Sequence, residues 1–103
     1  MSETWLSKGI QYLEDKKFVE AIEALEKSLA LEKDDEANLW LGEAYLNAGR
    51  YQEAIDTLQL YIESHPMDTN ALNNKGKALF QLKRFEEAIA CYDQALLHNP
   101  THK

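Results

Sequence analysis

Side chains that could act as metal ligands are few in this sequence and lie apart along it. The three histidines, His65, His98 and His102, fall at or just after the ends of predicted helices. Pro100 separates His98 from His102, so no helical turn places both rings on one face. The closely spaced cysteines and histidines of zinc sites are missing. We therefore expect surface histidines, no metal site and no cofactor.

Residues that could serve acid–base or nucleophilic chemistry are also isolated. The single cysteine, Cys91, has no identifiable activating partner beside it in the sequence, which favours a packed structural thiol over a nucleophile. The acidic pairs at 14–15 and 86–87 are typical of solvated helix faces rather than of a general acid and base. A glycine-rich phosphate loop is missing as well. The sequence predicts that the protein is not an enzyme.

The overall composition narrows the function classes further. The chain has 103 residues and a net charge of −7, which fits one domain and disfavours binding to nucleic-acid phosphates. A membrane span needs an apolar run of about 20 residues, and the sequence contains none. The first residues lack the basic and apolar regions of a signal peptide, and a lone cysteine suits a reducing compartment. We expect a cytoplasmic protein that binds no nucleic acid and does not insert into a membrane.

The elements that position the side chains come from an internal repeat. The motif FVEAI at residues 18–22 returns as YQEAI at 51–55 and as FEEAI at 85–89, with spacings of 33 and 34 residues. Three glycines follow the same rhythm: Gly9, Gly42 and Gly76. Glycine in a helix interior costs about 1 kcal/mol relative to alanine, so its recurrence indicates that a neighbouring helix approaches closely at this point.

Each repeat unit has the pattern of two amphipathic helices. Apolar residues recur with a period of 3.6, and no stretch alternates with a period of two, so we expect an all-α fold without strands. Gly49 interrupts one helix pair, and Pro66 and Pro100 end the second helices of the later repeats. Aromatic residues at positions 18, 51 and 85 are expected to fill the corners between paired helices. The predicted helices are 3–14, 18–31, 36–47, 51–64, 70–82 and 85–98.

These residues resemble the tetratricopeptide repeat (TPR), a helix–turn–helix unit of 34 residues with the pattern W-x2-L-G-x2-Y, A-x3-F and P. The second unit carries this pattern at Asn38, Leu41, Gly42, Tyr45, Ala54, Leu58 and Pro66. The first unit has Lys33 where proline is expected. The resemblance implies three repeats, at 2–34, 35–68 and 69–102, which form a right-handed α-solenoid of about six helices. It also implies an adaptor or scaffold whose first helices line a concave groove.

The family's layout assigns residues to this groove. The expected partner-binding residues are Leu6, Ile10, Leu13, Leu39, Trp40, Glu43, Leu46, Asn70, Asn74, Lys77 and Phe80. Trp40 is equally compatible with anchoring a partner and with packing against neighbouring helices. The asparagines offer amides to a peptide backbone. Lys77 is expected either to meet a carboxylate of the partner or, preferably, to pair with a nearby glutamate.

The resemblance also identifies a subclass of TPR domains that grip acidic chaperone tails with a clamp of lysine, arginine and asparagine. The corresponding positions here are Leu6, Ile10, Trp40, Asn70 and Asn74, without a basic residue. Binding of such tails is therefore not expected. The acidic groove favours an apolar or mildly basic protein segment, such as one face of an amphipathic helix.

An alternative role lies at the end of the repeat array. The last predicted helix carries Ile89, Tyr92 and Leu96, which are ready to stack on another helix and have no capping helix after them. This pattern predicts either self-association through an end face or a piece cut from a longer protein. Acidic residues dominate 35–68, whereas 69–103 is net basic, and this polarity could favour head-to-tail stacking.

Overall fold

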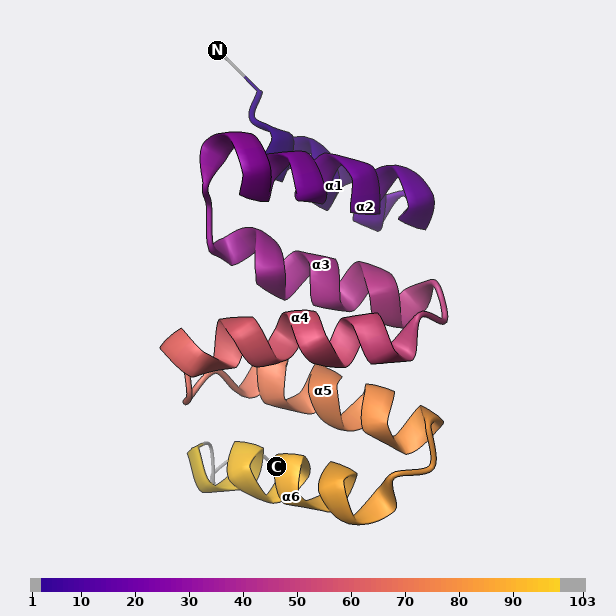
Figure 1. Cartoon of the computed structure of the whole chain (residues 1–103), viewed down its shortest axis with the longest axis vertical. Coiled ribbons are helices and arrows are strands. Elements are labelled where there is room, and N and C mark those ends of the chain that lie inside the picture. Colours follow the sequence, from indigo (N-terminus) through magenta and orange to yellow (C-terminus); the bar gives the residue numbers. More distant parts are fainter. Residues whose placement is uncertain (1–2, 99–103) are drawn as a thin grey trace.

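The computed structural model describes the backbone of residues 3–98 and the side chains of residues 3–97. The described residues form helices and no strand, which confirms the all-α prediction. The order is α1 (Trp5–Glu14), α2 (Phe18–Lys27), a π-helical turn η1 (Ser28–Glu32), α3 (Glu36–Asn47), α4 (Tyr51–Ser64), α5 (Thr69–Gln81) and α6 (Phe85–His98). The helices stack along one axis, from α1 and α2 at one end to α6 at the other (Figure 1). The resulting solenoid measures 41 × 25 × 24 Å.

The turns between paired helices share one geometry. Lys16, Gly49 and Lys83 follow the first helix of each pair and adopt positive φ angles of 61°, 81° and 65°. In each turn, the next amide donates to a carbonyl five residues back: Lys17 to Tyr12, Arg50 to Tyr45 and Arg84 to Leu79, at 2.8–2.9 Å. This is the Schellman end of a helix, in which a left-handed residue lets the chain reverse.

Side chains cap the first helices α1 and α5. Thr4 and Ser7 exchange hydrogen bonds in a capping box at α1, and the Asp68 carboxylate accepts from the Ala71 amide at α5. The second helices α2 and α4 begin after Lys17 and Arg50, whose side chains make no cap hydrogen bond.

The recurring glycines are explained by the contact between paired helices. A methyl group on Gly9 or Gly42 would overlap the side chain of Leu25 or Leu58, and on Gly76 it would lie 2.8 Å from the Tyr92 ring. The close approach predicted from the glycine spacing is therefore present in all three helix pairs.

The core runs along the stack instead of surrounding one centre. Leu25 and Leu58 are completely buried on α2 and α4, and Leu72 and Leu79 lie on α5 with 2 % of their surface exposed. Two clusters of buried residues make up this core, with Trp40 and Leu46 at the margin of one and Leu39 at the margin of the other. Each helix therefore has one face in the core and another face available for function.

Candidate functional site

A pocket of about 330 Å³ opens between α3 and α5, the first helices of the second and third pairs. It is lined by Leu39, Trp40, Glu43, Leu46, Asn47, Asn70, Asn74 and Lys77. The residues of each helix are spaced by about one turn, so one face of α3 and one face of α5 form the two walls. Seven of the eight were expected to contact a partner, and Asn47 completes the lining.

The Trp40 side chain contacts both the core and the pocket. The ring is half-buried and packs against the larger core cluster, and it also lines the pocket. Its Nε1 donates a hydrogen bond of 3.1 Å to Glu36 Oε2, one turn earlier on α3. Since this bond satisfies the polar edge of the indole, the ring offers mainly apolar surface to the pocket.

The polar residues that line the pocket differ in how many hydrogen bonds they already make within the protein. Asn47 Nδ2 donates to the Glu43 carbonyl oxygen at 3.0 Å, which occupies one amide proton. In the described part of the chain, Asn70, Asn74 and Lys77 have no side-chain partner within hydrogen-bond or ion-pair distance. The expected pairing of Lys77 with a glutamate is therefore wrong. A bound segment could use these three groups.

The remaining predicted groove residues do not all reach this pocket. Leu6 and Ile10 are half-buried on α1, where Leu6 packs against the core. Leu13 is 9 % exposed and belongs to the core, so the prediction that it contacts a partner is wrong. Phe80 is 54 % exposed near the end of α5 and contacts Phe85 edge to face, with ring centroids 5.2 Å apart.

The three residues predicted to form an end face differ in exposure. Ile89 and Leu96 are 57 % and 53 % exposed on α6. Tyr92 is half-buried, and its ring packs over Gly76 within the third helix pair. Tyr92 therefore serves the same intra-pair contact as Leu25 and Leu58, and its assignment to an end face is corrected.

A second cavity was not predicted from the sequence. It has a volume of about 340 Å³ and lies between α4, α5 and α6, with Lys75, Arg84 and Cys91 among its lining residues. Burial raises the pKa of the Cys91 thiol, so the sulfur is held in its less reactive protonated form. No periodic signal distinguishes this cavity, because the side chains that line it come from three helices.

Histidine and acidic side chains form structural contacts. The His65 ring stacks on Tyr61 at 4.1 Å, and its Nδ1 lies 3.5 Å from Asp35 Oδ2, which connects the end of α4 to the start of α3. Within residues 3–97, no group of three or more His, Cys, Asp and Glu side chains is placed to hold a metal ion. The predictions for His98 and His102 fall outside the described side chains.

None of the helices in the described part of the chain combines the length and apolar character that crossing a bilayer requires.

Helix pairs of nearly equal length, glycine contacts at one register and a concave pocket define a helix–turn–helix repeat protein. The family model described as anaphase-promoting complex, cyclosome, subunit 3, which is of TPR type, matches residues 12–95. This chain belongs to the tetratricopeptide-repeat family.

Two known proteins are similar to this chain over a small part of their own length. The chain is 28 % identical over 94 residues to the bovine (Bos taurus) BBSome complex member BBS4, covering 91 % of this chain and 18 % of BBS4. It is 32 % identical over 90 residues to the mouse (Mus musculus) superkiller complex protein 3, covering 85 % of this chain and 6 % of that protein. The chain thus spans less than a fifth of either relative.

Solved structures match the whole stack. The first TPR domain of Spaghetti (RPAP3), bound to the HSP90 peptide SRMEEVD, superposes with a TM-score of 0.87 at 26 % identity, covering 93 % of this chain and 77 % of that one. A crystal structure of MamA gives a TM-score of 0.90 at 27 % identity, covering 95 % of this chain and 58 % of MamA. The fold is that of a protein–protein interaction module.

Proposed function

We propose that this protein is an adaptor that binds an apolar or mildly basic segment of a partner protein in the pocket between α3 and α5. The proposal depends chiefly on Trp40, whose ring combines a fixed orientation with an open apolar face between Leu39 and Leu46. Tryptophan in a partly desolvated concavity is among the residue types that contribute most to binding energy. The free amides of Asn70 and Asn74 suit a peptide backbone.

The charges around the pocket favour a partner without many carboxylates. Glu43 lines the pocket and Glu36 lies beside Trp40, against one cation in the lining, Lys77. Residues 35–68 carry seven acidic side chains against the single cation Arg50. A basic side chain that flanks an apolar anchor would therefore be attracted, and an acidic one repelled.

The peptide bound by the RPAP3 domain is acidic, but this chain lacks the basic residues that would hold such a peptide. This difference also supports a partner segment without many carboxylates. The positions that would hold an acidic tail in the clamp are here Leu6, Ile10, Trp40, Asn70 and Asn74, none of them basic. We therefore propose a groove of the same architecture but of different specificity. A cytoplasmic location, which the lone cysteine suits, is part of the proposal.

The test uses the fluorescence of Trp40 in a Trp5→Phe background, which leaves a single tryptophan. Three probes are titrated: an amphipathic leucine–lysine peptide, a leucine–glutamate peptide of the same pattern, and SRMEEVD. We expect the lysine peptide to shift the emission and to bind at least tenfold more tightly than either acidic peptide. Equal affinity for the three peptides, or preference for an acidic one, would contradict the proposed specificity.

Two variants of the wild-type chain separate binding from folding, with affinities measured by calorimetry. Trp40→Ala removes the anchor but also part of the core margin, so Asn74→Ala, which removes a half-exposed side chain, is measured with it. Both should weaken the lysine peptide, by about 30-fold for Trp40→Ala if it removes 2 kcal/mol of binding energy. Leu60→Ala is the control, because Leu60 is 58 % exposed on α4 and does not line the pocket. Unchanged binding by both pocket variants would refute the site.

A further inference from the structure

Within the described residues, no helix covers the outer face of α6, whereas the equivalent faces of α2 and α4 are covered by the next helix. Ile22 on α2 and Ile55 on α4 follow the repeated alanine and are 5 % and 7 % exposed, whereas Ile89, at the same register on α6, is 57 % exposed. Leu96 and Phe85 show the same difference, since their counterparts in both earlier pairs are half-buried. In Figure 1, α3 lies beyond α2 and α5 beyond α4, while α6 ends the stack. The repeat itself thus shows that a first helix is the natural occupant of this face.

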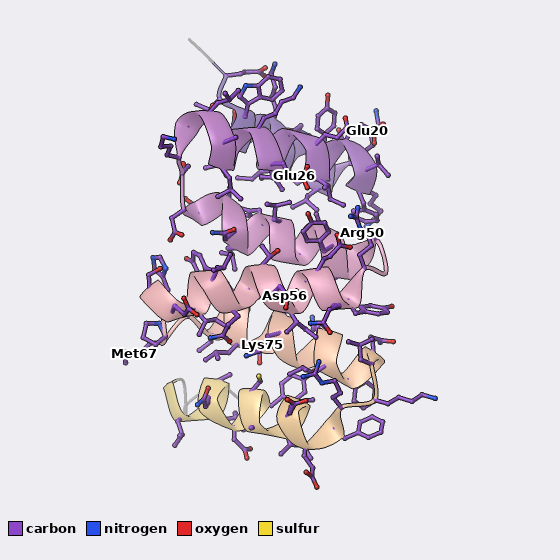
Figure 2. All side chains as sticks on the ribbon, in the orientation of Figure 1. Glu20, Glu26, Arg50, Asp56, Met67 and Lys75 are labelled. Atoms are coloured by element: carbon purple, nitrogen blue, oxygen red, sulfur yellow. The ribbon has the colours of Figure 1, made fainter. Side chains whose placement is uncertain are left out.

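Each existing joint between helix pairs is also closed by a polar contact at one register. Glu26 follows Leu25 on α2 and accepts a 2.8 Å hydrogen bond from the Tyr45 hydroxyl of α3. Gln59 follows Leu58 on α4 and accepts a hydrogen bond from Lys75 Nζ of α5. Glu26 and Lys75 are labelled at these joints in Figure 2.

Asp93 is the third acceptor in this series, because it follows Tyr92 on α6. It is exposed, and its carboxylate makes no hydrogen bond or ion pair with the rest of residues 3–97. A first helix that covers α6 should therefore bring a donor to Asp93.

The first helix α1 carries both kinds of donor at the required registers. Lys8 precedes Gly9 as Lys75 precedes Gly76, and Tyr12 follows Gly9 by three residues as Tyr45 follows Gly42. Lys8 Nζ lies 4.7 Å from the centre of the Trp5 ring, where Lys27 also lies at 4.5 Å. Trp5 would thus keep a cation over its ring if Lys8 turned to a carboxylate.

We propose that a second copy of this chain covers α6 with its α1, so that copies associate head to tail. Lys8 and Tyr12 of one copy would donate to Asp93 of the next, and the apolar surface at Ile89 and Leu96 would be buried. The charges at the contact agree, because α6 carries only acidic charged residues, Asp93 among them, and Lys8 of α1 is basic. This interface is separate from the pocket between α3 and α5 and goes beyond the proposed function.

A two-fold pairing of α6 with α6 is the competing arrangement. It would set the acidic residues of α6, Glu86, Glu87 and Asp93, against the same residues of the other copy. Head-to-tail contact avoids this repulsion and, because each copy keeps one open end, produces concentration-dependent chains instead of a closed dimer.

Two variants of the 103-residue chain test the arrangement by analytical ultracentrifugation. Lys8→Glu blocks the α1 face by repulsion from Asp93, and Ile89→Glu blocks the α6 face at an exposed position. We expect the wild-type chain to increase in mean mass with concentration at low salt and to return toward a monomer near 1 M salt, where the screening length is about 3 Å. Each variant alone should be monomeric. Their mixture should give a 1:1 dimer, because one variant retains a functional α6 face and the other a functional α1 face.

Other results would overturn the proposal. A two-fold α6 dimer predicts that Lys8→Glu associates like the wild-type chain and that mixing it with Ile89→Glu yields no new species. A wild-type chain that stays monomeric at every concentration and at low salt would also refute it. Circular dichroism must show that both variants retain their helices, and Val19→Glu, at an exposed position on α2, controls for added charge.

Discussion

Gly42 on α3 lies so close to Leu58 on α4 that a single methyl group on Gly42 would overlap the leucine side chain. Leu58 is completely buried, so it cannot turn away into solvent. We predict that Gly42→Ala lowers the free energy of unfolding by about 1–3 kcal/mol, the usual cost of forcing a methyl group into a packed core. Urea denaturation followed by circular dichroism measures this loss.

The control is Gly76→Ala. At this position the nearest atoms belong to the outer part of the half-buried Tyr92 ring, which can move. The loss should therefore be smaller than for Gly42→Ala. If Gly76→Ala loses as much unfolding free energy as Gly42→Ala, or more, then Gly42 does not set the distance between α3 and α4.

In the three turns within helix pairs, we expect some substitutions to stabilise the protein. Lys16 and Lys83 adopt the left-handed conformation in which a β-carbon is strained, while Gly49 occupies the equivalent place without strain. We predict that Lys16→Gly and Lys83→Gly each stabilise the protein by about 0.5–1 kcal/mol, and that Gly49→Ala destabilises it by about 1 kcal/mol.

Thermal and urea unfolding of these variants measure the three effects. No side chain lies within 4 Å of a β-carbon added at Gly49, so a loss in Gly49→Ala reports backbone strain and not a clash. Lys17→Gly, one residue further on, provides the matched control and should not stabilise the chain.

The helix pairs could be predicted because the same sequence motif occurs three times. A glycine, an alanine and an aromatic residue return together every 33 or 34 residues, and the observed bounds of α3, α4 and α6 coincide with the predicted ones. Most of the pocket followed from the same register, because residues one helical turn apart on α3 and α5 must share a face.

What the register could not predict is how much of each side chain remains exposed. Leu13, Leu46 and Phe80 each follow a glycine by four residues, yet Leu13 is buried, Leu46 is half-buried and Phe80 is exposed. Their positions within a repeat are equivalent, but the helices that surround them differ along the stack. Exposure is therefore a property of the assembled array and not of the motif.

The geometry of the joint after α2 could not be predicted from the sequence either. Lys33 stands at the register of Pro66 and Pro100, but its φ of 55° is one that the proline ring cannot adopt. The preceding turn is π-helical and brings Glu32 to the start of α1, a contact between residues 27 positions apart in the chain. Local propensity carries no information on such a contact.

Glu32 leads to a prediction about pH. Its Oε2 accepts from the Trp5 amide at 2.7 Å and its Oε1 from the Leu6 amide at 3.3 Å, and these bonds, the Trp5 bond foremost, lower the pKa of the carboxyl group below its usual 4.5. A carboxyl whose pKa is lowered by folding stabilises the protein above its unfolded pKa, and this contribution is lost as the pH falls through the folded pKa. We predict that Glu32→Gln lowers the melting temperature at pH 7 and that its difference from wild type shrinks below about pH 4.5.

Melting curves from pH 7 to pH 3 test this dependence. Glu20→Gln, on the exposed side of α2, removes a carboxylate that makes no hydrogen bond to the other described residues and should change the melting temperature little. A difference between Glu32→Gln and wild type that stays constant over the whole range would show that the ionised carboxylate does not stabilise the start of α1.

Tyr45 provides a test of the joint between α2 and α3 at the other end of the pH scale. Burial and the hydrogen bond from its hydroxyl to Glu26 raise the pKa of Tyr45 to about 12. A group whose pKa is raised by folding contributes stability that is complete below its unfolded pKa, near 10, and lost as the pH rises toward 12. We predict that Tyr45→Phe costs about 1.5–3 kcal/mol at pH 7, as expected for a hydrogen bond to a charged group, and that this cost falls between pH 10 and 12. Urea denaturation at each pH measures the cost. Burial also raises the pKa of Tyr61 and Tyr92, so absorbance near 295 nm should show one late-ionising tyrosine fewer in Tyr45→Phe than in the wild-type chain. If the two chains lose stability in parallel above pH 10, the hydroxyl bond to Glu26 does not contribute to closing the joint, and the same role inferred for Asp93 at the α6 face loses its support.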